Sequence, residues 1–183
     1  MSARKPRPAQ PGVAGAEDVE AMIRVDHAGE YGAVRIYEGQ LAVLGRSSRL
    51  AGAIRRMAAQ EEAHLAAFDK LVNARAVRPT ALEPVWRVAG FALGAATALM
   101  GEKAAMACTA AVEEVIDAHY AAQVQRLDHD PGLREAIAAF REDEIAHRDE
   151  ALSHGAEQAP GYRVLSEAIK AGCRLAIKLS ERI

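Results

Sequence analysis

Apolar side chains recur at steps of three and four residues along most of the chain, a spacing that places them on one face of an α-helix. The first segment with this pattern runs from about 17 to 44, and the second from about 49 to 76. Pro79 and Pro84 then interrupt the pattern, because proline lacks the amide hydrogen that a helix interior requires. The first half of the chain is therefore predicted to hold two long amphipathic helices.

The second half of the chain shows the same pattern, less regularly at its start. We expect a long helix over about 85–128, bent near Gly101, and another that begins at Pro131-Gly132. Pro160-Gly161 opens a last helix toward the C-terminus. Because short connections make sequential helices antiparallel neighbours, the sequence predicts an all-α, up-down four-helix bundle with a fifth helix packed on it.

Composition narrows the class of protein. Half of the 183 residues are apolar, yet the mean hydropathy is −0.09, which indicates a soluble or peripheral protein. The net charge of −2 gives no reason to expect nucleic acid as a partner. Cys108 and Cys173 show no metal-binding spacing and fit a reducing compartment. Residues 1–16, rich in proline, glycine and basic residues, are expected to form a disordered tail that is not a signal peptide, before a single domain over 17–183.

Two of the predicted helices carry the same polar residues on their apolar face. Glu61 and His64 form a Glu-x-x-His pair whose members lie one helical turn apart, and Glu144 and His147 form another. A carboxylate on an apolar face is informative, because burying it unpaired costs on the order of several kcal/mol. One such pair recurs by chance in helical proteins, whereas two inward-facing copies indicate a shared site.

A second regularity adds one glutamate to each half of the chain. Glu30 precedes Glu61 by 31 residues. Glu113 precedes Glu144 by the same 31 residues, so the two halves are offset by 83 residues. Glu114 is equally acidic, and only the spacing selects Glu113. One Glu and one Glu-x-x-His from each half is the ligand set of ferritin-like di-iron and di-manganese carboxylate proteins, so the predicted bundle is ferritin-like, with additional C-terminal and membrane-facing helical segments.

The charge of these residues favours a pair of divalent metal ions. Four carboxylates carry four negative charges, which two divalent ions would neutralise inside a low-dielectric core. Carboxylate oxygens with two imidazoles suit iron or manganese better than zinc or lone magnesium. A buried network of structural ion pairs is the alternative, but these helix faces carry no matching set of Lys or Arg. The predicted metal ligands and catalytic residues are Glu30, Glu61, His64, Glu113, Glu144 and His147.

Four more polar residues lie near the predicted ligands. Asp26 and Asp117 each lie one turn from a predicted ligand, so either could orient a ligand histidine, although a helix-surface charge is the simpler interpretation. His119 and Tyr120 follow Glu113 on the same helix. Relay of protons or electrons and plain core packing are both open interpretations of this pair.

Two segments favour contact with a membrane. Residues 88–100 form an uncharged run of 13 residues, which is too short to span a bilayer. The last helix has apolar residues on one side and Lys170, Arg174 and Lys178 on another. Packing within the bundle would explain either segment alone, and together they favour a peripheral membrane protein with a lipid substrate.

Four runs of the sequence carry a resemblance to a known family: DHAGEYGAVRIYEGQ (26–40), EEAHLAAFDKL (61–71), GFALGAATALMGEKAAMACTAAVEEVIDAHY (90–120) and AGCRLAIKLSERI (171–183). They closely resemble the demethoxyubiquinone hydroxylases of ubiquinone biosynthesis, over about 20–183. The resemblance implies that the six residues bind two iron ions (Fe2+/Fe3+) per chain and that the third-helix ligand is Glu113, not Glu114. It also implies that Glu61 and Glu144 bridge the irons.

What the resemblance implies about function is a mono-oxygenase reaction. A 2-polyprenyl-3-methyl-6-methoxy-1,4-benzoquinol would gain one hydroxyl group from O2, with electrons from the quinol or from a reduced nicotinamide donor acting through it. The apolar segment 88–100 would admit the prenyl tail from the bilayer. The implied partners are this polyprenyl benzoquinol, O2 and the membrane surface. Contacts with other ubiquinone-biosynthesis proteins and with a second copy of the chain are open alternatives.

Two other functions are compatible with the same residues. A ferritin-like ferroxidase or other iron-handling protein would use the same six ligands, although a soluble iron store would not need the membrane-facing segments. A non-catalytic lipid-binding protein with a vestigial site is the third interpretation.

Relative to eukaryotic members, the chain lacks a recognisable long transit peptide and has a short connection after its third helix. We therefore expect a bacterial protein at the cytoplasmic face of the inner membrane.

Overall fold

The computed structural model describes residues 15–45 and 48–183, and this part of the chain is helical throughout, without strands. The elements are α1 (Ala16–Leu44), α2 (Ala51–Ala74), α3 (Glu83–Leu99), α4 (Glu102–Val124), α5 (Pro131–Ser153), the short 3-10 helix η1 (Ala156–Gln158) and α6 (Tyr162–Ser180). The all-α prediction is confirmed. Of the tail predicted over 1–16, residues 1–14 lie outside the described part, and α1 begins at Ala16.

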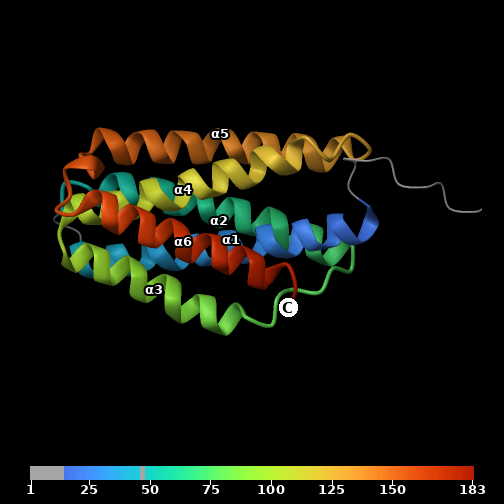
Figure 1. Cartoon of the computed structure of the whole chain (residues 1–183), viewed down its shortest axis with the longest axis horizontal. Helices are drawn as coiled ribbons and strands as arrows, with labels where there is room; N and C mark the ends of the chain where they lie inside the picture. The colour runs from blue at the N-terminus through green and yellow to red at the C-terminus, as the bar shows by residue number, and fades with distance from the viewer. Residues whose placement is uncertain (1–14, 46–47) are drawn as a thin grey trace, which may run out of the picture.

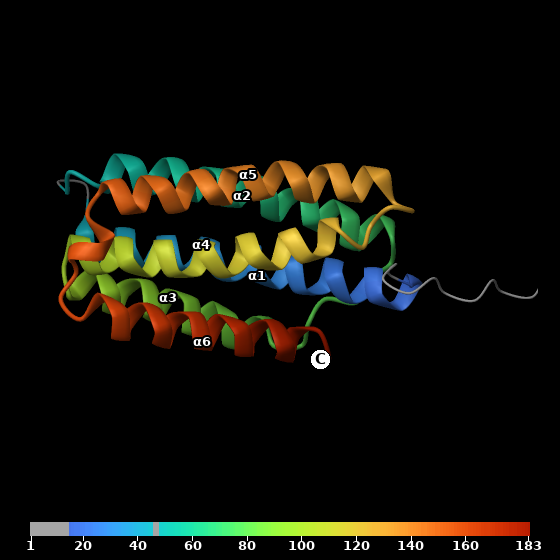
Figure 2. The same ribbon diagram turned by 45° about the horizontal axis from the view of Figure 1, so that its top comes forward.

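The helices are stacked in layers, each of which pairs one helix from each half of the chain (Figure 2). Helices α2 and α5 form one layer, α1 and α4 the next, and together they make the predicted four-helix bundle. Helix α3 packs on α1, and α6 packs on α4, so these two helices form the third layer (Figures 1 and 2). The repeat that was inferred from glutamate spacing therefore extends to a third helix in each half.

The prediction of one long, bent helix over 85–128 is wrong. The chain instead reverses between α3 and α4, which run antiparallel in different layers (Figure 1). Gly101 makes the reversal, with a φ of 113° that residues with a side chain rarely adopt. A single glycine in an otherwise helical pattern suggests only a bend, so the sequence alone did not separate the two helices. The reversal moves the apolar segment 88–100 onto the outside of α1.

Helices α1 and α3 approach each other through glycines. A Cβ atom placed on Gly94 would lie 2.0 Å from the backbone oxygen of Ile36, and one on Gly39 would lie 2.2 Å from the backbone oxygen of Phe91. Real side chains do not tolerate such distances, so the two backbones could not pack this closely with larger residues. The glycines thus set the spacing between the outer layer and the bundle.

We expect Gly94→Ala to destabilise the protein by about 1–3 kcal/mol, the usual cost of overpacking, because α3 must move away from α1. Urea unfolding followed by circular dichroism measures this change. Gly52→Ala is the matched control: it lies in α2, where an added Cβ meets only the mobile end of Arg56 at 3.8 Å. This control is expected to be neutral or to stabilise the helix by up to about 1 kcal/mol. Equal effects of the two substitutions would contradict the close-packing explanation.

Candidate metal centre

The six predicted ligands come together in the middle of the bundle, where each is at most 3% exposed. Apolar clusters that include Met57 and Phe68 lie on either side of them along the helix axes. The ligand atoms form two groups, and within each group all atoms lie within 4.8 Å of one another. The groups are Glu30, Glu61, His64 and Glu144, and Glu61, Glu113, Glu144 and His147. Glu61 and Glu144 belong to both groups, as carboxylates shared between two metal ions would.

The helical register explains why these glutamates and not their neighbours reach the centre. Glu62 and Glu142 are exposed, as the helix pattern predicts. Glu114 is also on the outside, where its carboxylate lies 2.6 Å from the Nζ atom of Lys170. Glu113 is 1% exposed, so the structure places the residue selected by the repeat spacing in the core.

Many polar atoms at this centre have no hydrogen-bond partner among the described residues. They include both carboxylate oxygens of Glu61 and of Glu144, one oxygen each of Glu30 and Glu113, and the Nδ1 atoms of His64 and His147. Buried polar atoms of folded proteins are nearly always satisfied, so a cluster of unsatisfied ones suggests a missing ligand. Carboxylate oxygens and imidazole nitrogens are a donor set that suits iron or manganese. The residues present therefore fit metal ions.

Without metal, the carboxylates at the centre compete for protons. Burial, and then the nearby charge of Glu144, raise the pKa of Glu61 and of Glu113 well above the usual value. Glu144 behaves differently: burial opposes ionisation, but the imidazole rings of His147 and His64 beside it outweigh burial and lower the pKa of Glu144 to about 2. Burial likewise opposes protonation of His64, yet the adjacent carboxylates of Glu144 and Glu30 raise its pKa to about 10. The metal-free centre therefore holds protons that metal would displace.

These shifts predict that the metal-free protein loses stability as pH rises. Glu61, Glu113 and His64 all have folded-state pKa values above their unfolded ones, so the folded state binds more protons between the two values and is destabilised as pH increases. The shift of Glu144 has the opposite sign, but the pH dependence that it causes lies below its ordinary pKa of 4.5, and its contribution to stability is constant above that pH. Thermal unfolding of metal-free and metal-loaded protein should show a gap in Tm that widens from about pH 6 to about pH 8.5. A constant gap would contradict the assignment of these protons.

Two buried tyrosines hold Glu30 and Glu113, the two predicted ligands that are not part of a Glu-x-x-His pair. The Tyr37 hydroxyl donates to Glu113 Oε1 at 2.8 Å, and the Tyr120 hydroxyl donates to Glu30. Each tyrosine is on the helix opposite to its glutamate, so the two halves exchange hydrogen bonds. Sequence reasoning left packing and relay open for Tyr120 and overlooked Tyr37, although Tyr37 and Tyr120 obey the same 83-residue offset as the ligands.

The ligand histidines are oriented by residues that sequence reasoning also overlooked. His64 donates from Nε2 to Asp143 Oδ2 at 3.0 Å. His147 donates from Nε2 to Gln60 Oε1 at 3.0 Å. The sequence signal was present, because each of these partners directly precedes a Glu-x-x-His pair. With Nε2 donating outward, the Nδ1 atoms of both rings face the centre.

Asp26 and Asp117 do not take this role. Asp26 is 2% exposed, so the interpretation as a surface charge is wrong for it, and its Oδ1 atom accepts hydrogen bonds from Gln123 at 2.8 Å and from His119 at 3.2 Å. Asp117 is partly exposed and pairs with Arg141 of α5 at 2.6 Å. Its interpretation as a charge on the helix surface is consistent with that ion pair.

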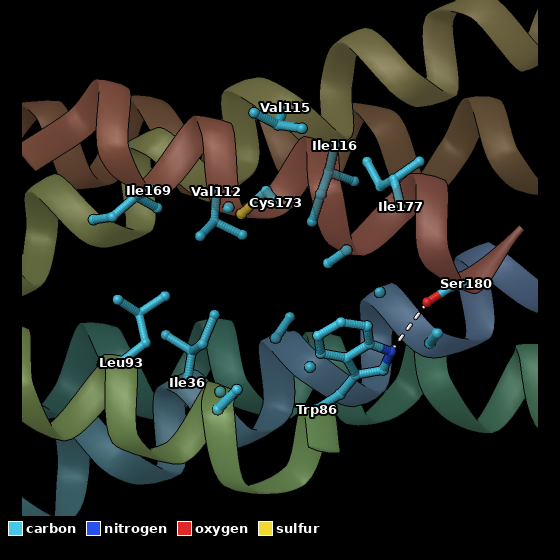
Figure 3. A pocket seen from close by; sticks show the side chains of 18 of the residues that line it. Ile36, Trp86, Leu93, Val112, Val115, Ile116, Ile169, Cys173, Ile177 and Ser180 are labelled. Carbon is cyan, nitrogen blue, oxygen red and sulfur yellow. Dashed lines mark hydrogen bonds between the residues drawn. The ribbon is translucent and has the colours of Figure 1, made fainter. Parts of the chain in front are cut away.

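An apolar cavity of about 560 Å³ lies between α3 and α6 (Figure 3). Its floor is formed by α1 and α4, the helices that carry Glu30 and Glu113, and includes Ile36 and Val112. At one end, Trp86 of α3 donates a hydrogen bond from Nε1 to Ser180 Oγ of α6 at 3.0 Å. Helices α1 and α4 therefore have the cavity on one side and the glutamate-histidine centre on the other.

The outer helices only partly match the membrane-facing surface that was predicted. Lys170 is 8% exposed and paired with Glu114, so it does not join Arg174 and Lys178 in an exposed basic row. Part of the apolar stripe of α6 lines the cavity. Among the described residues, no helix combines the length and apolar character needed to cross a membrane.

Comparison with known proteins places the chain in a family. The sequence profile of the ubiquinone biosynthesis protein COQ7 family matches residues 17–180. A 3-demethoxyubiquinol 3-hydroxylase from Rhodospirillum rubrum is 61% identical over 166 residues, which cover 90% of this chain and 78% of that protein. A mitochondrial NADPH-dependent 3-demethoxyubiquinone 3-hydroxylase from Homo sapiens is 54% identical over 170 residues, with the same coverage of 90% and 78%. A mitochondrial 5-demethoxyubiquinone hydroxylase from Saccharomyces cerevisiae is 42% identical over 182 residues, again covering 90% and 78%. The resemblance seen in the sequence is confirmed, and the chain belongs to the ubiquinone biosynthesis protein COQ7 family.

Proposed function

We propose that the chain is a 3-demethoxyubiquinol 3-hydroxylase, an O2-dependent mono-oxygenase that adds one hydroxyl group to a 2-polyprenyl-3-methyl-6-methoxy-1,4-benzoquinol in ubiquinone biosynthesis. The observation that carries this proposal is the buried set of six metal-ligating side chains beside a large apolar cavity. The printed names of the relatives support the same activity. A ferroxidase would use the six ligands but has no use for a cavity lined almost entirely by apolar side chains.

The proposed cofactor is a pair of iron ions. Glu30 and His64 would hold one ion and Glu113 and His147 the other, with the two shared glutamates between them. When bound, the metal pair supplies the redox chemistry that O2 activation requires, which protein side chains alone do not provide. Manganese would accept the same donors, so iron is proposed on the basis of the reaction.

The protein's own residues then contribute binding, orientation and exclusion of water. The apolar cavity would take the prenyl tail of the quinol, because its size lies within the range of about 300–1,000 Å³ that ligand sites usually have and its lining includes few polar atoms. The Tyr37 and Tyr120 hydroxyls hold the carboxylates of Glu113 and Glu30 in fixed orientations. The apolar clusters on both sides of the centre keep bulk water away from it.

The proposed site of action is a membrane surface, where the polyprenyl substrate is dissolved. Exposed apolar side chains gather on α3 and directly after it, with Val88 at 66%, Leu99 at 76% and Met100 at 57%. Arg174 and Lys178 of α6 are exposed on the same outer layer and would favour anionic lipids. The cytoplasmic side of a bacterial inner membrane is the location that we propose on the basis of the sequence.

We expect Val88→Glu/Leu99→Glu to reduce co-sedimentation with anionic lipid vesicles by at least about fivefold, since two charges would enter the apolar boundary of the bilayer. The matched control is Ala59→Glu/Ala139→Glu, which adds the same charges to exposed positions of α2 and α5 in the opposite layer. If both variants bind equally well, α3 is not the surface that meets the membrane.

Mass spectrometry of the cellular quinone pool tests the proposed function. Cells that lack a demethoxyubiquinol hydroxylase should accumulate the quinone that lacks one methoxy group, and expression of this chain should clear it and restore ubiquinone. Persistent accumulation despite expression of folded, iron-loaded protein would contradict the proposal. An iron-handling role would then be the next function to test.

A further inference from the structure

The two residues that orient the ligand histidines are also joined to each other. Gln60 of α2 donates from Nε2 to Asp143 Oδ1 of α5 at 3.3 Å. A continuous series of hydrogen bonds therefore runs from His147 through Gln60 and Asp143 to His64. It crosses between α2 and α5, on the side of the bundle opposite to the cavity.

The chemistry of these side chains fixes which group donates and which accepts in each hydrogen bond of the series. The Asp143 carboxylate can only accept hydrogen bonds, so it receives one from His64 and one from the Gln60 amide group. The amide oxygen of Gln60 is then left to accept from His147. Every donor in the series meets an acceptor, and both histidines carry their proton on Nε2.

The two groups of metal ligands match each other except in the residue that accepts a hydrogen bond from the histidine. We call each group a half-site. Gln60 and Asp143 occupy equivalent places, because each directly precedes a Glu-x-x-His pair. The terminal ligands of the half-sites are the same, one Glu and one His each, and each terminal Glu accepts a tyrosine hydrogen bond. Behind one histidine, however, lies a carboxylate, and behind the other lies an amide.

We propose that Gln60 and Asp143 are positioning residues that hold both histidines as one unit and make the two metal positions unequal, with tighter binding at the position of His64. This inference rests on the proposed pair of metal ions. A carboxylate behind a ligand imidazole strengthens its lone pair and fixes its ring, and loss of such a partner weakens metal binding by about 10–100-fold. Because Asp143 is 43% exposed, solvent screens its charge, and about tenfold is the expected size.

Exchanging the amide and the carboxylate between positions 60 and 143 reverses the charge difference behind the two histidines while keeping the size of both side chains. In Gln60→Glu/Asp143→Asn, the new carboxylate lies behind His147 and the new amide behind His64, and the hydrogen bond between positions 60 and 143 runs in the reverse direction. All four residues remain satisfied. Gln60→Glu alone sets two carboxylates face to face, and Asp143→Asn alone sets two amides together. Each single substitution should therefore disturb metal binding more than the double one does.

Titration with Co(II) alone, followed by absorption, tests the inference in variants that keep one metal position. Glu113→Ala keeps the position of His64, and Glu30→Ala keeps the position of His147. We expect the Kd of Glu113→Ala to be about tenfold lower than that of Glu30→Ala. In the Gln60→Glu/Asp143→Asn background, the ratio of the Kd of Glu30→Ala to the Kd of Glu113→Ala should fall by at least about tenfold. Glu142→Gln, which removes an exposed charge beside Asp143, should leave both Kd values unchanged.

A ratio of Kd values that is the same in both backgrounds would overturn the inference while leaving the proposed metal pair intact. Loss of binding in Glu142→Gln would overturn it as well, because a general surface charge would then explain the effect. Failure of the proposed metal pair itself is distinguishable, since the unsubstituted chain would then bind no Co(II) at all.

Discussion

Glu144→Ala is expected to remove both metal ions from the protein and to abolish hydroxylation while the helices stay folded. Glu144 contributes to both groups of ligand atoms, so its loss affects the two metal positions together. The apolar clusters on both sides of the centre are left intact by the substitution, so the helices are expected to stay folded. Iron analysis should fall from about two ions per chain to fewer than one, with the circular dichroism spectrum retained.

Glu142→Ala is the matched control for this experiment. Glu142 lies on the same helix, two residues earlier, but is exposed and takes no part in either ligand group. Its replacement should leave iron content and turnover unchanged. Full iron content in Glu144→Ala would mean that the assigned ligands are wrong.

Gly172→Phe is expected to reduce kcat/KM for a long-tailed quinol by at least about tenfold without changing the iron content. Gly172 lines the apolar cavity from α6, and a Cβ atom added there meets no other atom within 4 Å. A phenyl group would therefore extend into space that the prenyl tail is proposed to occupy. The loss should appear mainly as a higher KM, because the metal centre lies on the other side of α1 and α4.

Ala171→Phe adds the same side chain to the neighbouring position of α6, which is exposed and does not line the cavity. Its turnover should stay close to that of the unsubstituted protein. Equal losses in both variants would show that an aromatic group on α6 impairs the enzyme by another route. Unchanged activity in Gly172→Phe would exclude the cavity as the site of the tail.

The clustering of the six glutamates and histidines could be predicted from the sequence because these residues obey two independent regularities. Glu-x-x-His pairs place two ligands on one helix face, and equal spacing in both halves identifies Glu30 and Glu113. The same 83-residue offset could have identified Tyr37, Gln60 and Asp143 as related positions. Their hydrogen-bond partners could not be predicted, because each partner lies in the opposite half of the chain and helical spacing carries no information on contacts between helices.

The outer layer was harder to predict for a different physical reason. The segment on either side of Gly101 favours helix throughout, and only the positive φ of that glycine turns one expected helix into two. The charge of Lys170 likewise suggested an exposed row, but Glu114 of α4 pairs with it. Long-range packing decided both features, and the local sequence does not encode it.

Single turnover of the iron-loaded protein with a demethoxyubiquinol under ¹⁸O₂ is the most direct test of the proposed centre. Hydroxylation at the buried glutamate-histidine site predicts a product that carries one ¹⁸O atom on the quinone ring, as measured by mass spectrometry. The same experiment with Glu144→Ala should give no such product. Oxidation of the quinol without oxygen insertion, or a new hydroxyl group that derives from water, would contradict the proposed mono-oxygenase activity.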